Sequence, residues 1–312
     1  MEVSWVFVIF LGLWTSTAFA ECPKPSLTST LPSPPQMELL VDFSYELSQK
    51  LISCKDPPYV TRFKKNGKEL SFVSVQHGFG PESQNPHFQV IRKAVERDRP
   101  QVVLLESLPH SEGVNSTTIT DMIPVCEKES FKSCPEIHFS ASLARQQGVP
   151  FIGTELSERE ILRSLEPEFS KSDYACFRWT VMLTFQGEEF SNSHPRFKFN
   201  REQFSLSLKE KLGVQFTYED FLKCFKSVTK QEFDSTKLNT DFFRPDNSAT
   251  SNTFQKIMYL SDRGRNPRML RVISDTLMKY DKALVVLGWG HLVAQIAVLE
   301  DMLGPASFDC NP

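Results

Sequence analysis

The sequence predicts an α/β fold, with α+β as the alternative: a mixed, partly parallel central sheet flanked by helices, with a helical insertion. Short apolar runs rich in β-branched residues alternate along the chain with amphipathic helical patterns, which is typical of strands joined by crossover helices. Four of these runs end at a histidine or a glutamate. Continuous apolar runs of this kind indicate strands that are buried on both faces, as in parallel sheets.

The first half of the chain supplies one complete strand-helix-strand unit. Apolar residues at helical spacing predict a first helix from Leu39 to Leu51. The basic stretch from Arg62 to Lys68 indicates a solvated turn, and residues 70–77 then predict a strand. A helix from Phe88 to Arg99 leads directly into a second strand, 101–106. This spacing fits a right-handed parallel crossover.

The second half of the chain also alternates strands and helices, but a long helical stretch separates its two strands. Residues 149–155 predict a third strand, which follows a helix that ends near Gly148. Residues 157–230 contain helical patterns and no clear strand, so we expect a helical insertion over the sheet, at about 157–250. Its phenylalanines are expected to be core residues, with a substrate pocket as the alternative. One long or broken helix, 253–280, then feeds a last strand, 283–290, and a last helix, 292–303.

The amino terminus has the pattern of an export signal. Residues 1–20 contain an apolar centre and end in Ala18-Phe19-Ala20, a small-x-small cleavage pattern. Residues 21–36 form a leader rich in proline, serine and threonine, and residues 37–312 are expected to form a single domain. The protein is therefore expected to be secreted, to the extracellular space or the periplasm, with no membrane anchor left once the signal is removed.

All seven cysteines follow the predicted cleavage point, so they would enter an oxidising compartment in which disulfides persist. Cys126 and Cys134 flank a short polar loop and are the expected pair. The odd number leaves one cysteine unpaired or intermolecular. Asn115-Ser116-Thr117 is a glycosylation sequon.

Composition and missing motifs exclude several classes of protein. The formal net charge is −3 with mixed signs, which argues against a nucleic-acid partner. The sequence contains no Gly-x-Ser-x-Gly elbow, phosphate loop, His-Glu-x-x-His or Gly-x-Gly-x-x-Gly motif. Serine hydrolase, nucleotide-binding and zincin functions are therefore disfavoured.

Four polar side chains follow the predicted strands and point to a site. His77 and His291 each end an apolar run beside glycine, and Glu106 and Glu155 end two others. If the strands are parallel neighbours, all four side chains project into the crevice where open α/β sheets bind ligands. Imidazole and carboxylate groups in one crevice can bind a divalent metal ion or move protons. Glu155 has a second interpretation, as the first residue or cap of the next helix.

At these residues the chain resembles the TraB/TIKI superfamily. That group contains TIKI-type metalloproteases, TraB and GumN proteins, erythromycin esterases and ChaN-like haem-binding lipoproteins. The matching segments are Val75–His77, Val102–Glu106, Arg265-Asn266 with Met269, and Gly288–Leu292. Ser74 departs from the pattern, because the family has glycine there. The resemblance implies a mixed sheet flanked by helices, with two histidines, a glutamate and an arginine forming the site.

The leading hypothesis is a secreted metal-dependent hydrolase that cleaves a peptide or a small acyl substrate. His77, Glu106 and His291 would bind manganese, cobalt or zinc, because nitrogen and oxygen ligands without thiolate do not select among these ions. Glu155 would accept a proton from water. Given the resemblance, Arg265 would hold the carbonyl oxygen as charge develops there.

Three other functions remain open at this level. In a metal-independent esterase, a histidine would be the general base and Glu106 would fix its tautomer. In a binding protein without turnover, the histidines would hold haem or a metal ion. A secreted effector or adaptor would keep the fold without the chemistry.

Overall fold

The computed structural model describes residues 33–76, 84–132, 134–190, 194–239 and 242–312. The predicted signal and most of the leader lie outside these residues, as does His77.

A six-stranded mixed sheet in the order β4-β3-β5-β2-β1-β6 forms the centre. Strands β4, β3, β5 and β2 run parallel, while β1 and β6 are antiparallel to their neighbours. The strands are β1 (Tyr59–Lys65), β2 (Lys68–Val75), β3 (Val102–Pro109), β4 (Phe151–Glu155), β5 (Lys282–Gly288) and β6 (Ser307–Asp309). The predicted α/β fold class is therefore confirmed.

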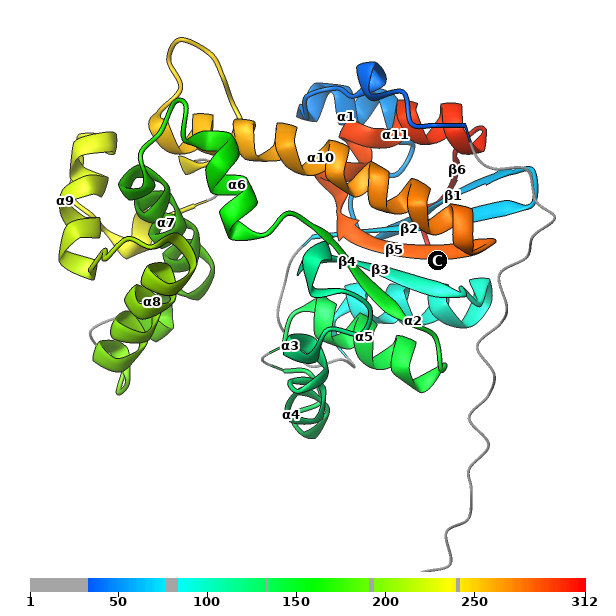
Figure 1. Ribbon diagram of the computed structural model, residues 1–312, viewed down its shortest axis with the longest axis horizontal. Helices are drawn as coiled ribbons and strands as arrows, with labels where there is room; N and C mark the ends of the chain where they lie inside the picture. The colour runs from blue at the N-terminus through cyan, green and yellow to red at the C-terminus, as the bar shows by residue number, and fades with distance from the viewer. Residues whose placement is uncertain (1–32, 77–83, 133, 191–193, 240–241) are drawn as a thin grey trace, which may run out of the picture.

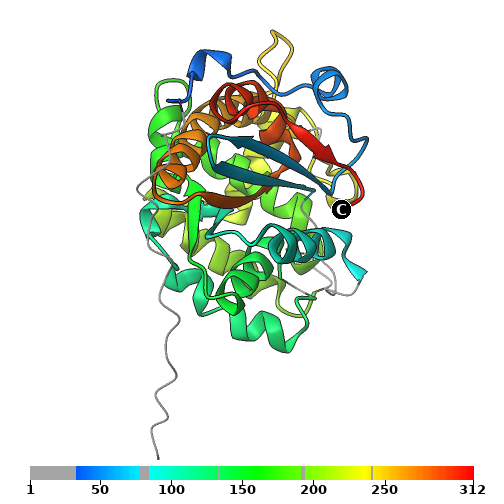
Figure 2. The ribbon, with the colours of Figure 1, turned by 90° about the vertical axis from the view of Figure 1, so that its right-hand side faces the viewer.

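Helices cover both faces of the sheet (Figure 1), and the strands alternate their apolar side chains between the two layers. In β5, Leu284 and Val286 face one layer, whereas Val285 and Leu287 face the other. The first layer contains α2 (Pro86–Asp98), α3 (Thr117–Thr120), α4 (Ile123–Lys128) and α5 (Glu136–Gln146). The second contains α1 (Tyr45–Leu51), α10 (Thr253–Lys279) and α11 (Trp289–Leu303). Figure 2 shows the twisted strands between these layers.

Two expectations about the amino-terminal part were wrong. The stretch Arg62–Lys68 belongs to a β-hairpin, not a turn between helix and strand, because Asn66 and Gly67 adopt positive φ angles of 53° and 80°. An Asn-Gly pair with positive φ at both positions makes the tight turn that joins twisted antiparallel strands. The first helix begins at Tyr45, where the Ser44 hydroxyl accepts a hydrogen bond from Leu47 N at 3.0 Å. Residues 40–44 form no helix, and Leu40 and Ser44 have extended backbone.

The predicted helical insertion consists of α6 (Glu158–Leu165), α7 (Lys171–Phe190), α8 (Phe197–Leu212) and α9 (Tyr218–Thr229). These helices lie beside the sheet, to the left in Figure 1, and enclose an aromatic core of their own. Helix α10 joins the two parts. Phe254 and Ile257 near its start belong to the aromatic core, while Met269 and Leu277 pack on the sheet.

Three disulfides link described cysteines: Cys54–Cys310, Cys126–Cys134 and Cys176–Cys224. The expected Cys126–Cys134 pair is confirmed, and the seventh cysteine, Cys22, lies outside the described residues. Three intramolecular disulfides fit an oxidising, secreted environment. None of the helices in the described part of the chain is both long and apolar enough to cross a membrane.

Candidate functional site

Three of the side chains singled out at strand ends meet at one edge of the sheet. Glu106 lies near the end of β3, Glu155 ends β4, and His291 lies in the first turn of α11, directly after β5. One potential ligand atom from each lies within 4.8 Å of the others, and all three residues are buried. Parallel strands bring their carboxyl ends to the same edge, which is why residues so far apart in sequence converge.

A bulge in β3 follows Glu106 directly. Glu106 continues the alternation of β3 and points toward α10 and α11. The register with β4 then shifts between Leu105 and Pro109, and Ser107 takes the left-handed region at φ 59°. Gly153 of β4 permits this, because a Cβ there would lie 2.1 Å from the Leu108 carbonyl oxygen. The bulge therefore depends on the close approach of two backbones.

Arg265 of α10 joins the carboxylates. Its Nε donates to Glu155 Oε2 at 2.9 Å, and its Nη2 donates to Glu106 Oε1 at 3.0 Å and to Glu155 Oε1. Its Nη1 donates to Asp262 Oδ1 at 3.1 Å. Burial lowers the pKa of Arg265. The three carboxylates raise it by more than burial lowers it, so the pKa lies well above its ordinary value. Arg265 thus stays charged and ties β3, β4 and α10 together.

His291 is held from both sides of its ring. Its Nδ1 lies 2.8 Å from Asn266 Oδ1, which also accepts a hydrogen bond from Gln295 Nε2 at 2.9 Å. Because an amide oxygen only accepts, Nδ1 carries the proton and the Nε2 lone pair of a neutral ring faces Glu106 Oε1 at 3.2 Å. Glu106 Oε2 accepts from the Gly288 backbone N–H. A lone pair aimed at a carboxylate oxygen calls for a cation or a proton between them.

The residues present fit a divalent metal ion. Within this group, three carboxylates face the single guanidinium of Arg265, which leaves two negative charges uncompensated when His291 is neutral. Two ligands of one ion, each about 2.1 Å from it, lie roughly 3.0–3.4 Å apart, and the Glu106–His291 contact of 3.2 Å falls in that range. The identity of the ion is not determined by these donors. The haem alternative has no support among the described residues, because His291 Nε2 faces Glu106 and not open space.

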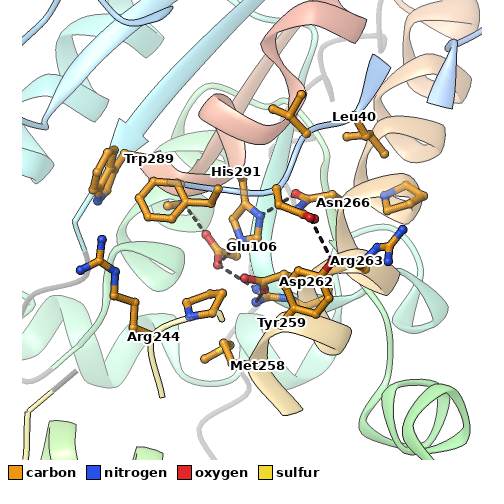
Figure 3. Close-up of a pocket in the computed structure, with 18 of the residues that line it drawn as sticks. Leu40, Glu106, Arg244, Met258, Tyr259, Asp262, Arg263, Asn266, Trp289 and His291 are labelled. Carbon is orange, nitrogen blue, oxygen red and sulfur yellow. Dashed lines mark hydrogen bonds and ion pairs between the residues drawn. The ribbon is translucent and has the colours of Figure 1, made fainter. Parts of the chain in front are cut away.

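A pocket of about 700 Å³ opens above these groups (Figure 3). Glu106, Asp262 and His291 lie in its depth. Apolar walls come from the segment before α1, from α10 and from the start of α11: Leu40, Phe43, Met258 and Trp289. Arg244 and Arg263 lie toward opposite sides of the view in Figure 3. The volume is typical of sites for small molecules or short chain segments.

The structure places the predicted site residues unequally. Glu106, Arg265 and His291 line the pocket, whereas Glu155 lies behind Arg265 and is not among the lining residues. Ser74, where the family pattern has glycine, is buried beside its cross-strand partner Tyr59.

Sequence reasoning assigned no role to Asn266 or Asp262. Asn266 orients His291 and directly follows Arg265 in sequence. Asp262 lies one helical turn before Arg265, and that spacing was the signal available in the sequence.

No protein-family model, curated protein or solved structure matches this chain, so the fold class and the site rest on the chain's own residues and geometry.

Proposed function

We propose that this chain is a secreted, TraB/TIKI-like metal-dependent hydrolase that cleaves a peptide or a related acyl bond in the pocket above Glu106 and His291. The observation that supports the proposal most directly is the 3.2 Å contact between His291 Nε2 and Glu106 Oε1. Asn266 turns the Nε2 lone pair toward this carboxylate, and histidine ligands of metal ions are oriented in this way by a bond to the other ring nitrogen.

Glu106 and His291 would hold the ion, and Glu155, which lies close to both, is bound through both oxygens to Arg265. His77 remains a ligand expected from the sequence alone. A bound divalent ion would supply Lewis acidity and make water acidic enough to react near neutral pH. The chain's own groups do the rest. Arg265 keeps the three carboxylates in place through its hydrogen bonds and lines the pocket in which negative charge develops on the carbonyl oxygen during acyl hydrolysis.

Glu155 acts mainly through Arg265 in this proposal. Both of its oxygens accept hydrogen bonds from the guanidinium. A carboxylate held in this way is a poor proton acceptor for water in the pocket, so its earlier assignment as the base is not retained.

Metal content tests the proposal. Purified mature protein, incubated with manganese, cobalt or zinc and then dialysed, should retain about one ion per chain by mass spectrometry. Glu106→Gln and His291→Asn should lose the ion, while the matched control His194→Ala, in the helical part, should keep it. A wild type that retains no ion after supplementation would refute the metal-dependent mechanism.

A second candidate rests on the same contact. If a proton instead of a metal ion lies between Nε2 and Glu106, the pair is a histidine–carboxylate dyad, as in the metal-independent esterase alternative. Hydrolysis that survives exhaustive chelation and is lost in His291→Asn would favour this version.

A further inference from the structure

Acyl hydrolysis needs a group that takes a proton from water and gives one to the leaving group. Neither glutamate of the site is suited to this. Both oxygens of Glu155 accept from Arg265. Glu106 Oε1 contacts Arg265 and His291, and Oε2 accepts from the Gly288 backbone.

Asp262 is placed differently. It lines the pocket, and Figure 3 shows it in the depth of the pocket close to Glu106. Its Oδ1 accepts from Arg265 Nη1 at 3.1 Å, whereas Oδ2 has no hydrogen bond or ion pair with any residue that the structure describes. The side chain is 24% exposed, so one carboxylate oxygen remains available to a molecule in the pocket.

We propose that Asp262 is the proton-transfer residue of the hydrolysis, an inference that rests on the proposed function. Oδ2 accepts a proton from the attacking water as the water oxygen bonds to the acyl carbon. Asp262 then gives that proton to the leaving nitrogen or oxygen as its bond to the acyl carbon breaks. Water is added across the acyl bond, and the Asp262 carboxylate is regenerated.

The surroundings of Asp262 suit this role. Burial raises its pKa above the ordinary value, and the charge of Arg265 on its own helix lowers it, as His291 on α11 would if protonated. Glu155 on β4 and Glu106 on β3 raise it further. A carboxylate is a better base when its pKa lies closer to the working pH. Activity should fall at acid pH, because protonated Asp262 cannot accept a proton.

The test uses two substrates with the same acyl group, hexanoyl p-nitroanilide and p-nitrophenyl hexanoate. The nitrophenolate leaves without a proton, whereas the anilide nitrogen needs one. Asp262→Asn should lower kcat on the anilide by about 10²–10⁴-fold. It should lower kcat on the ester less, because only the proton transfer from water is lost there, and KM and ion content should be unchanged. Asp262→Glu should keep part of the activity and move the acid limb of the pH profile. Asp275→Asn, at an exposed position on α10, is the matched control and should behave as wild type.

The outcomes separate this inference from the proposed function. Equal losses on the two substrates would overturn the role of Asp262 as proton donor to the leaving group, and lost ion content in Asp262→Asn would show that Asp262 only positions Arg265. Wild-type activity in Asp262→Asn would overturn the inference while leaving the hydrolase proposal standing. An anilide-selective loss in a protein that holds no metal ion would support the proton-transfer role and refute the metal-dependent part alone. A metal-loaded wild type that cleaves neither substrate would overturn both.

Discussion

Replacing Gly153 with alanine should damage the edge of the sheet that carries the site. A Cβ at this position would lie 2.1 Å from the Leu108 carbonyl oxygen, 2.6 Å from its carbonyl carbon and 2.7 Å from its Cγ. The two closest atoms belong to the backbone, which cannot turn away as a flexible side chain can. Because a Cβ and a backbone oxygen approach no closer than roughly 3 Å, strands β3 and β4 would have to move apart by close to 1 Å.

Overpacking of this kind destabilises by about 1–3 kcal/mol, and more where backbone must move. We expect about 3 kcal/mol for Gly153→Ala. Gly264→Ala is the matched control, because its new Cβ would meet only Leu156 Cδ1 at 3.6 Å and Ser164 Oγ at 3.8 Å. Alanine also favours the interior of α10 by roughly 0.5–1 kcal/mol over glycine. The two glycine variants should therefore change stability in opposite directions.

Equilibrium urea unfolding of the wild type and both variants measures the difference, with equal m-values as the condition for comparison. Because Glu106 directly precedes the bulge, Gly153→Ala should also bind metal ion more weakly than Gly264→Ala. A Gly153→Ala protein within 0.5 kcal/mol of wild type would show that the bulge relaxes freely, and the argument from close backbone approach would fail.

Two further predictions concern charge and covalent links. Arg265→Met leaves three carboxylates without their cation and should lower the free energy of unfolding by about 3–5 kcal/mol, measured by urea unfolding at pH 7. A decrease of less than about 1 kcal/mol would contradict a stabilising role for the buried ion network. The cysteines of Cys176–Cys224 are 48 residues apart, and removing this disulfide should destabilise the folded protein by about 4 kcal/mol through the regained entropy of the unfolded chain. The cysteines of Cys126–Cys134 are 8 residues apart, and its removal should cost about 2.5 kcal/mol. Paired serine variants compared by thermal unfolding test this order, and the reverse order would argue against it.

Much of the sheet was predictable because its strands are marked locally. The apolar runs that contain Glu106 and Glu155, and the one that precedes His291, are strands in the structure. Strand β1 was missed although Asn66-Gly67 is a strong hairpin signal, because the basic residues around this pair favour a solvated turn. The start of α1 was missed because the apolar spacing continues through residues 40–44, which are not helical.

The site was predictable only in part, because helices contribute to it through packing that no local pattern encodes. Arg265 bonds to glutamates 159 and 110 residues away. The Arg265 side chain reaches these glutamates only because of the way α10 packs on the sheet. The same packing turns Asp262 into the pocket and Asn266 toward His291.

The sequence by itself determined that the apolar runs that contain Glu106 and Glu155, and the one that precedes His291, become strands. Each of these runs ends near a group able to bind a metal ion or a proton, and such runs are recognisable because alternation and β-branching act over a few residues. Only the tertiary structure decided that the last parallel strand, β5, inserts between β2 and β3. That insertion brings His291 to Glu106 across 185 residues. Strand order depends on how apolar surface is buried across the whole domain, and the grouping of side chains in the pocket depends on the strand order.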